Sequence, residues 1–492
     1  MYSERHVRRG FLACIAAVVC SLVFPGAGHL AIRARLRPPV IVAAALNLMA
    51  VLAVVVIAGP VRNRTDLAEV IADRAAFLWL AVALLMLALT RLWSAVDSAW
   101  LARPPGSLHT ALRVTAAATA AVLVVAGVAP LAVAANYIWQ TDRAIETVFS
   151  SGEATTAKPT PLSTTTTWAP TTTATAPDDT GNPTTTVAVT TTTTTPVFPG
   201  EDRVNVLLLG GDAGPGRWSL RTDSMIVVSI DPDTGDTSMI SVPRNLSRIP
   251  FPPGTSMAER YPKGFDEIAN AVYTRADSHP EWMGGIPDAG AQAIKLGIAQ
   301  FLGIPIHYYV LVDMAGFVDV VDALGGIDIN VTKRVPSGGY RADEKHPVPK
   351  WFELGPQHMD GTVALAYARS RAADSDYGRM ARQRCVLAGI AAAATPRAIA
   401  FGLTDLMGAF GAAVRTDIPR ERLDEVSQLV DRYSQAGGLD AVRTLQLAPP
   451  IMDPADWDPA EVRALVAEVL NPTVVPVPVE GAPPPLLGSA CA

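Results

Sequence analysis

The chain has 492 residues, a net charge of −6, an apolar content of 49% and a mean hydropathy of +0.26. This length allows two or three domains, and the high apolar content suggests a membrane-embedded part. No block of like charge stands out, which argues against a nucleic-acid partner. The four cysteines form no C-x-x-C pair and the seven histidines no H-E-x-x-H motif, so no zinc site or metalloprotease is indicated.

The first 148 residues are predicted to form a membrane region. Three stretches approach the ~17–25 apolar residues that a bilayer span needs, and they cover residues 39–57, 75–93 and 113–139. A fourth stretch, 10–23, is shorter. It runs into "FPGAGHL", where Pro25 and Gly26 would break a helix.

Two interpretations of the segment 10–30 remain open, a true span and a re-entrant or interfacial hairpin. Arginines lie on both sides of it, at positions 5, 8 and 9 and at positions 33, 35 and 37. The positive-inside rule places both groups in the cytoplasm, which favours a hairpin. Three spans then leave the large C-terminal part outside the cell, so we expect a multi-pass membrane protein with an extracytoplasmic domain. Four true spans would reverse that topology.

Residues 149–200 are rich in threonine and proline and have few large apolar side chains. Such a segment cannot build a core, so we predict a disordered, extended linker. If it were fully polyproline-like, its reach would be roughly 150 Å at ~3.1 Å per residue. The simplest interpretation is a spacer, and the alternative is an O-glycosylated spacer that crosses a cell wall.

From residue 201 onward, strand and helix patterns alternate, which predicts a layered α/β/α domain with a central mixed sheet. Strands are expected at 204–209, 225–230, 237–242, 306–313 and 327–331. Helices are expected at 289–303, 314–326, 360–371 and 378–394. We assign 201–400 to this domain, 401–472 to a C-terminal helical extension (helices within 399–433 and 459–469), and 473–492 to a disordered tail.

Two aspartates mark neighbouring predicted strands: Asp212 follows the first, and Asp223 opens the second. If these strands pair, the two carboxylates meet at one sheet edge, where oxygen ligands would suit Mg²⁺. The alternative is that both aspartates only cap turns. The glycine-rich loop after the first strand matches no standard phosphate-binding pattern.

Arginines are concentrated near the predicted helix pair: Arg369, Arg371, Arg379, Arg382 and Arg384 fall within sixteen positions. Arg379, Arg382 and Gln383 share a helix face, and Arg221 and Arg244 lie at strand ends near the aspartates. Clustered guanidinium groups suit a phosphate or diphosphate, although a solvated helix face is the usual explanation for charged helices. Arginines with a metal are the recurring set for phosphoryl transfer.

Residues 203–394 resemble the LytR-CpsA-Psr family. The resemblance rests on "NVLLLGGDAG", "LRTDSMIVVSIDP", "ISVPRN", "GIPIHYYVLVDMAGFVDVVDALGGIDINV" and "FELGPQHMDGTVALAYARSRAADSDYGRMARQR". Membrane spans ahead of the domain and a threonine-rich linker fit this resemblance, and the composition resembles that of high-GC actinobacteria. The family implies an α/β/α domain with an apolar cavity for a polyprenyl chain. It also implies Mg²⁺-dependent transfer of a glycopolymer from a polyprenyl (di)phosphate to peptidoglycan, forming a phosphodiester.

The resemblance also implies roles for individual residues. Asp212 and Asp223 would bind the metal. Arg244, Arg371 and Asp376 would be catalytic, with Asp376 as a base or as a partner that orients an arginine. The diphosphate would be bound by Arg221, Arg244, Arg371, Arg379 and Gln383, with Arg369 and Arg382 as weaker candidates.

The sequence departs from the family pattern at two places. Asn245 stands where many members have aspartate, so a base at that position is excluded. Ile268 stands where many have a lysine ahead of the asparagine that corresponds to Asn270, and Lys263 is a possible substitute. These departures put the handling of the acceptor or leaving group in doubt, but not the fold.

Two other functions stay open at this point. One is a pyrophosphatase that acts on polyprenyl diphosphates with water as acceptor. The other is a non-catalytic lipid-diphosphate-binding regulator of envelope assembly. The sequence does not decide which glycopolymer is moved, nor whether Cys385 and Cys491 form a disulfide.

Overall fold

The computed structural model describes residues 4–32, 37–62, 64–102, 110–149, 156–159, 201–212, 220–337, 347–371, 376–394, 414–471, 473 and 486–487. The chain forms two compact units. Unit 1 comprises Met1–Ala154, Val310–Ala373 and Arg382–Val430, and unit 2 comprises Thr155–Tyr309, Asp374–Ala381 and Asp431–Ala492. Each unit is described by itself below.

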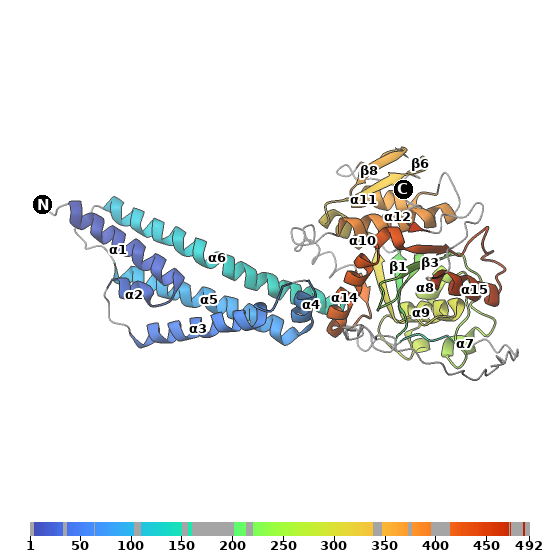
Figure 1. Ribbon diagram of the computed structural model, residues 1–492, viewed down its shortest axis with the longest axis horizontal. Coiled ribbons are helices and arrows are strands. Elements are labelled where there is room, and N and C mark those ends of the chain that lie inside the picture. Colours follow the sequence, from blue (N-terminus) through green and yellow to red (C-terminus); the bar gives the residue numbers. More distant parts are fainter. Residues whose placement is uncertain are drawn as a thin grey trace, which may run out of the picture. The chain divides into compact units, whose positions relative to one another are not determined.

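Unit 1 begins with the apolar helices. Their bounds are α1 (Glu4–Val23), α2 (Ala27–Ala31), α3 (Pro38–Ala58), α4 (Arg64–Ala72), α5 (Arg74–Leu101) and α6 (Thr110–Val148). Three of them, α3, α5 and α6, contain stretches long and apolar enough to cross a membrane, which agrees with the three predicted spans. Figure 1 shows α1, α3, α5 and α6 lying lengthwise beside one another.

Small side chains and hydrogen-bonded polar pairs hold these helices together. Ala95 on α5 packs between Val18 of α1 and Ala120 of α6. Asn47 on α3 donates a hydrogen bond to Thr90 on α5 at 2.9 Å. Membrane helices associate in this way because lipid provides no hydrophobic force between them, so close packing and internal hydrogen bonds dominate.

The chain turns directly after α1 and continues into α2. Gly26 has φ 92°, a left-handed conformation that glycine adopts without strain. At Gly28 a Cβ atom would lie 2.1 Å from the Ala17 carbonyl oxygen, so α2 packs closely against α1. The apolar part of α1, Leu12–Val23, is also shorter than a span. The arginines at 33 and 35 lie outside the described residues.

Unit 2 is built on β1 (Val204–Gly211), β2 (Thr222–Ile230), β3 (Thr237–Val242) and β10 (Arg443–Gln446), in the order β10-β3-β2-β1. The pairs β1–β2 and β2–β3 are antiparallel, whereas β10 runs parallel to β3. The predicted α/β class with a mixed central sheet is confirmed. β3 is buried at every position, including the polar residues Thr237, Ser238 and Ser241.

Helices of unit 2 cover this sheet. They are α7 (Ser256–Arg260), η1 (Ala269–Ala271), α8 (Val272–Asp277), η2 (Pro280–Met283), α9 (Ala289–Leu302), η4 (Gly438–Ala441) and α15 (Pro459–Leu470). α15 packs on α9, β3 and β10. Its first turn is capped by Asp458, whose carboxylate accepts from the backbone N–H groups of Ala460 and Glu461.

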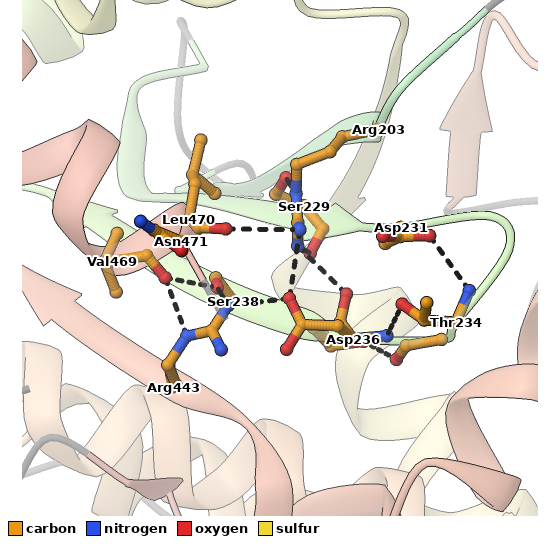
Figure 2. A network of polar contacts seen from close by, with 12 residues as sticks. Arg203, Ser229, Asp231, Thr234, Asp236, Ser238, Arg443, Val469, Leu470 and Asn471 are labelled. Carbon is orange, nitrogen blue, oxygen red and sulfur yellow. Dashed lines mark hydrogen bonds and ion pairs between the residues drawn. The ribbon is translucent and has the colours of Figure 1, made fainter. Parts of the chain in front are cut away.

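A polar network ties α15 to one end of the sheet (Figure 2). Both Arg203 and Arg443 donate to Oδ2 of Asp236, at 3.0 and 2.6 Å. Arg443 also donates to the carbonyl oxygen of Val469, and Arg203 to that of Leu470. We call this network, with Ser229 and Ser238, the Asp236 cluster. It satisfies the free carbonyls at the α15 C-terminus with positive charge, which the helix dipole favours.

β4 (Tyr308–Asp313) begins in unit 2 and continues into unit 1, where it pairs antiparallel with β9 (Val414–Thr416). Unit 1 also holds α10 (Met314–Ala323), β5 (Ile327–Val331), β6 (Val335–Pro336), β7 (Trp351–Phe352), β8 (Gly355–Met359), α11 (Gly361–Arg369), η3 (Arg420–Arg422) and most of α12 (Asp376–Ala393) and α14 (Leu423–Gln435). β5 alternates buried and exposed residues, and its apolar face packs against Val386 of α12.

The stretch 401–472, predicted as a helical extension, contains α14 and α15 but also contributes the unpredicted strands β9 and β10 to strand pairing. Both strands are too short, at three and four residues, to produce a recognisable alternation. In the predicted tail, Leu487 is buried and its N–H donates to the Val442 carbonyl. The rest of the tail, apart from Thr473 and Leu486, and the linker apart from 149 and 156–159 lie outside the described residues.

Candidate active site

The antiparallel pairing of β1 and β2 brings the two predicted metal-binding aspartates to the same strand ends. The register shifts between Gly210 and Gly211, which pair with Ser224 and Thr222, so Asp223 is the extra residue of a bulge. The N–H groups of Asp212 and Asp223 both donate to the carbonyl oxygen of Arg221. Bulges of this kind redirect a side chain out of the regular ladder.

Arg244 lies at the same end of the sheet, directly after β3. Its Nη1 donates to Asp223 Oδ1 at 2.9 Å, and its Nε donates to Asp376 Oδ2 at 2.7 Å. Each bond joins a guanidinium to a carboxylate, a charge-assisted contact stronger than a neutral hydrogen bond. Asp376 is the first residue of α12, where the helix dipole favours a negative charge.

Arg379 follows one turn later on α12 and is almost completely buried. Its Nη1 lies 3.9 Å from Asp223 Oδ2 and its Nη2 lies 3.8 Å from Asp376 Oδ2. These distances are longer than hydrogen bonds, so Arg379 acts on both carboxylates mainly through its charge. A hydrogen bond from β10 holds the start of α12 in place: Gln446 donates to the carbonyl oxygen of Tyr377 at 3.3 Å.

Asn270 completes the group, which we call the Asp223 cluster: Asp223, Arg244, Asn270, Asp376 and Arg379. Asn270 Nδ2 donates to Asp223 Oδ1 at 3.0 Å, and the Asn270 N–H donates to the Arg244 carbonyl. The side chain is buried, and its Oδ1 has no hydrogen-bond partner in the described part of the chain. Sequence reasoning noted Asn270 only as part of a motif and did not assign it to the site.

The pKa values within the cluster follow from this geometry. Burial by itself raises the pKa of the Asp223 carboxyl, but the hydrogen bonds from Arg244 and Asn270 and the charges of Arg244 and Arg379 lower it overall. Burial by itself lowers the pKa of Arg244, and the bonds to Asp376 and Asp223 raise it overall. Both groups are therefore held in their charged forms.

The remaining predicted site residues belong to both units. Arg221 is an exposed residue at the turn into β2. In unit 1, Arg369 contacts Met314, and Arg382 is buried and donates to the carbonyl oxygen of Ser370. Arg371 is exposed and Gln383 is half-buried, both in unit 1. Within unit 2 the structure brings together Arg244, Asp376 and Arg379 of the predicted diphosphate and catalytic set with the predicted metal ligand Asp223, and Asp212 and Arg221 lie at the same strand ends.

Arg384 differs from all of these arginines. It is 1% exposed, and none of its three guanidinium nitrogens has a hydrogen-bond partner in the described part of the chain. Burial lowers its pKa to about 10. A buried charge without a partner is energetically costly, so this residue destabilises the fold unless something else compensates it.

The sequence of the chain also matches a known protein family. The model of the LytR_cpsA_psr family matches residues 165–450, more than half of its length. The chain belongs to the LytR_cpsA_psr family. This confirms the resemblance seen in its motifs.

Similar curated proteins include those named polyisoprenyl-teichoic acid--peptidoglycan teichoic acid transferase TagU. The chain is 28% identical to the Bacillus anthracis protein over 46% of its own length and 64% of that protein. It is 30% identical to the Oceanobacillus iheyensis protein over 50% of its own length and 67% of that protein. The chain thus spans slightly less than two thirds of the length of the Bacillus relative.

Solved structures of similar proteins include TagV of B. subtilis, with 26% identity, a TM-score of 0.39 and coverage of 56% of this chain and 99% of that one. Another is TagT bound to LIIa-WTA, with 24% identity, a TM-score of 0.38 and coverage of 56% and 92%. These TM-scores are too low to add to the family match.

Proposed function

We propose that this chain is a membrane-anchored phosphotransferase that joins a cell-wall glycopolymer, carried on a polyprenyl diphosphate, to peptidoglycan through a phosphodiester. The observation that carries the proposal is the Asp223 cluster, which combines two guanidinium groups with two carboxylates and a buried amide at one end of the sheet. Membership of the LytR_cpsA_psr family and the names of its TagU relatives support it.

The cluster residues have distinct roles in the proposed reaction. Arg244 and Arg379 bind the diphosphate oxygens, and Asp223 and Asp376 orient Arg244 from two sides. A sugar hydroxyl of peptidoglycan attacks the phosphorus nearest the glycan, the bond to the bridging oxygen breaks, and polyprenyl phosphate leaves. The arginines stabilise the negative charge that develops on these oxygens. The hydroxyl proton passes to a carboxylate of the cluster, for which Asp376 is the candidate.

A magnesium ion is part of the proposal. In the described part of the chain no group of three His, Cys, Asp or Glu side chains could hold a metal. The two carboxylates of Asp212 and Asp223 would be sufficient for Mg²⁺, because this ion is commonly held by one or two carboxylates together with substrate phosphates and water. When bound, it would neutralise charge on the transferred phosphoryl group.

We also propose that the domain that carries the cluster is extracytoplasmic. Cys385 on α12 is disulfide-bonded, whereas Cys14 and Cys20 in α1 are free thiols. Disulfides persist in oxidising compartments outside the cytoplasm. The fourth cysteine, Cys491, lies outside the described residues. The three long apolar helices would provide the membrane anchor.

The test uses the full-length protein in lipid vesicles with a polyprenyl-diphosphate-linked glycopolymer and purified peptidoglycan. The expected result is glycopolymer bound covalently to peptidoglycan, reduced by EDTA and restored by Mg²⁺. Arg244→Ala should abolish transfer, and Arg248→Ala is the matched control, since Arg248 is an exposed arginine that contacts Asp456 away from the cluster. Release of polyprenyl phosphate without linkage would instead indicate a pyrophosphatase. Tight lipid binding without turnover would indicate a regulator.

A further inference from the structure

The strands β5 to β8 form an antiparallel ribbon within unit 1 that the proposed reaction leaves without a role. The pairing of β5 with β8 ends at Val331↔Gly355, and the pairing of β6 with β7 begins at Val335↔Phe352. Three residues separate β5 from β6 and two separate β7 from β8, so one extra residue interrupts the ladder, as in a β-bulge. The two strand pairs therefore follow one another along a single two-stranded ribbon.

One face of this ribbon packs on a core, and the other face is exposed. The inward-facing side chains are buried against α10, α11 and α12 (Figure 1), and they are those of Ile327, Ile329, Val331, Val335, Phe352 and Met359. Because successive side chains of a strand point to opposite faces, the residues between them point away from this core. The exposed residues that point outward include Asp328, Asn330, Arg334, Trp351, Glu353 and His358, and we call these six the outer face.

Trp351 presents an aromatic ring at one end of the outer face. Its side chain is 43% exposed, and the Arg334 guanidinium lies 4.1 Å from the centre of the ring, which is the geometry of a cation–π contact. Arg334 is itself held by Glu353, because its Nε and Nη2 donate to the two carboxylate oxygens at 2.7 and 2.9 Å. Such a two-bond contact fixes the guanidinium in one plane. Arg334 therefore covers one face of the indole, and the exposed remainder is available to a ligand.

The charges of this ion pair are maintained by the same contact. The hydrogen bond to Glu353 raises the pKa of Arg334, and the hydrogen bond from Arg334 lowers the pKa of Glu353. Both groups thus stay charged around neutral pH, one as a donor and one as an acceptor.

The other end of the outer face also combines donors and acceptors. Asp328 and His358 are directly opposite in the ladder, and His358 Nδ1 lies 2.8 Å from Asp328 Oδ1. Their side chains are 88% and 62% exposed. Asn330, opposite Pro356, adds an exposed amide that can both donate and accept. The outer face is therefore polar along its length and carries an aromatic ring at one end.

This composition selects among classes of partner. With the adjacent exposed Lys333 and Lys350, cationic and anionic side chains are interspersed, which differs from the basic patch that a nucleic acid or an anionic lipid surface attracts. The mixed groups are instead complementary to a sugar polymer, whose hydroxyl groups both donate and accept, and whose ring C–H groups are attracted to the negative face of an indole. The ribbon is also elongated: from Asp328 to Pro336 it extends roughly 25 Å at ~3.3 Å per residue. A linear chain fits such a surface.

We propose that the outer face binds the glycan strands of peptidoglycan, with a sugar ring stacked on Trp351 and further hydroxyl groups bonded to Asn330 and Asp328. This inference rests on the proposed function, in which peptidoglycan is the acceptor. The outer face holds the acceptor and takes no part in the chemical step. Loss of Trp351 should therefore raise the KM for peptidoglycan and leave kcat near its wild-type value, as expected when uniform binding is removed.

The test measures binding of the detergent-solubilised full-length chain to purified insoluble peptidoglycan by co-sedimentation, without any lipid-linked donor. Trp351→Leu keeps an apolar side chain but removes the aromatic ring, and it should weaken binding about two- to tenfold. Trp351→Phe keeps a ring and should bind nearly as well as the wild type. Trp282→Leu is the matched control, because Arg260 lies 4.1 Å over Trp282 in a similar pair that is not part of the ribbon.

Equal binding by the wild type and by folded Trp351→Leu would overturn the proposal and would indicate another partner for this face, such as a protein. Absence of binding by the wild type would overturn it too. If Trp351→Leu does not fold, the exposed Asn330→Ala replaces it: weaker binding supports the proposal, and unchanged binding contradicts it. A chain that binds peptidoglycan through Trp351 but transfers no glycopolymer would contradict the proposed function and leave this inference standing.

Discussion

Two arginine–aspartate clusters lie at opposite ends of the same strands. They contain similar residues but differ in what those residues bind. In the Asp236 cluster, Arg203 donates from all three nitrogens to Ser229, Asp236 and Leu470. In the Asp223 cluster, the side chain of Arg244 donates to two carboxylates among the described residues, and Arg379 lies beyond hydrogen-bond distance of both. The arginines of the Asp236 cluster thus donate to backbone carbonyls as well as to the Asp236 carboxylate, whereas the described hydrogen bonds of the Arg244 side chain go to carboxylates.

The difference indicates which cluster is available to a ligand. Backbone carbonyls cannot move aside without unfolding α15, so the Asp236 arginines are committed to stability. Carboxylate partners can exchange their hydrogen bonds for those of a phosphate, because both are anionic oxygen acceptors that match the guanidinium geometry. Arg244, Asp223 and Asp376 are also each more than one-fifth exposed, whereas Arg443 is 8% exposed.

The largest expected effect concerns activity. Arg244→Ala should lower the transfer rate by at least about 10²–10³-fold, because it removes a preorganised donor for the developing charge. The melting temperature should also fall, because two charge-assisted hydrogen bonds are lost, so the rate is compared per folded molecule. Transfer assays and thermal denaturation of the full-length protein measure both effects. A variant that retains more than about one tenth of the wild-type rate would exclude Arg244 from the reaction.

The converse is expected at the Asp236 cluster. Arg443→Ala should destabilise the protein by about 3 kcal/mol, because it breaks a buried ion pair and leaves the Val469 carbonyl without its guanidinium donor. Transfer per folded molecule should stay near the wild-type value. Urea denaturation followed by tryptophan fluorescence, with transfer assays in parallel, tests this prediction. A loss of activity without a loss of stability would show that the two clusters do not differ in the proposed way.

A smaller effect is expected for Asn270. Asn270→Ala removes one donor from Asp223, a hydrogen bond to a charged group that contributes about 1.5–3 kcal/mol. The transfer rate should fall about tenfold or more, through a less well positioned Arg244. Asn270→Asp places a second negative charge beside Asp223 and should be worse than alanine. Equal rates for the two variants would mean that Asn270 does not act through Asp223.

In the described part of the chain Arg384 has neither a carboxylate nor a carbonyl partner, and this makes it a third case. Arg384→Met replaces a buried charge with an apolar side chain of similar length and should stabilise the protein by about 1 kcal/mol. The measurement is the melting temperature of the variant beside that of Arg382→Met, where the hydrogen bond to Ser370 is lost and stability should decrease. Destabilisation by Arg384→Met would reveal a partner for this guanidinium.

The smallest effect is a dependence on pH. The pKa of Asp223 is lower in the folded state than in the unfolded chain, so its ionisation contributes stability that is fully present above about pH 4. This contribution is lost as the pH falls through the folded-state pKa. The stability difference between wild type and Asp223→Asn should therefore shrink between pH 6 and pH 3, as measured by urea denaturation. A difference that is constant over this range would contradict the assignment.

Much of the fold could be predicted from sequence, because long apolar runs report burial directly. The spans at 39–57 and 75–93 agree with α3 and α5, and the strand predicted at 237–242 coincides with β3. The two strands that the sequence did not predict, β9 and β10, are short, and β10 pairs with β3, which lies about two hundred residues earlier in the chain. No local pattern encodes such a pairing, since it depends on which distant edge is free when the chain collapses.

The same division holds for the site. The sequence by itself determined which residue types were available: the aspartates beside the first two strands, the arginines of "SVPRN" and "YGRMARQR", and the family they indicate. Only the tertiary structure decided that Arg244 joins Asp223 to Asp376, 132 residues away, and that Asn270 supports Asp223. It also decided that Ala157 pairs with Ile306 and that Asn205 binds the next residue, His307. The physical reason is that composition and periodicity report burial and local conformation, whereas hydrogen-bond partners between distant residues are set by how the whole chain packs.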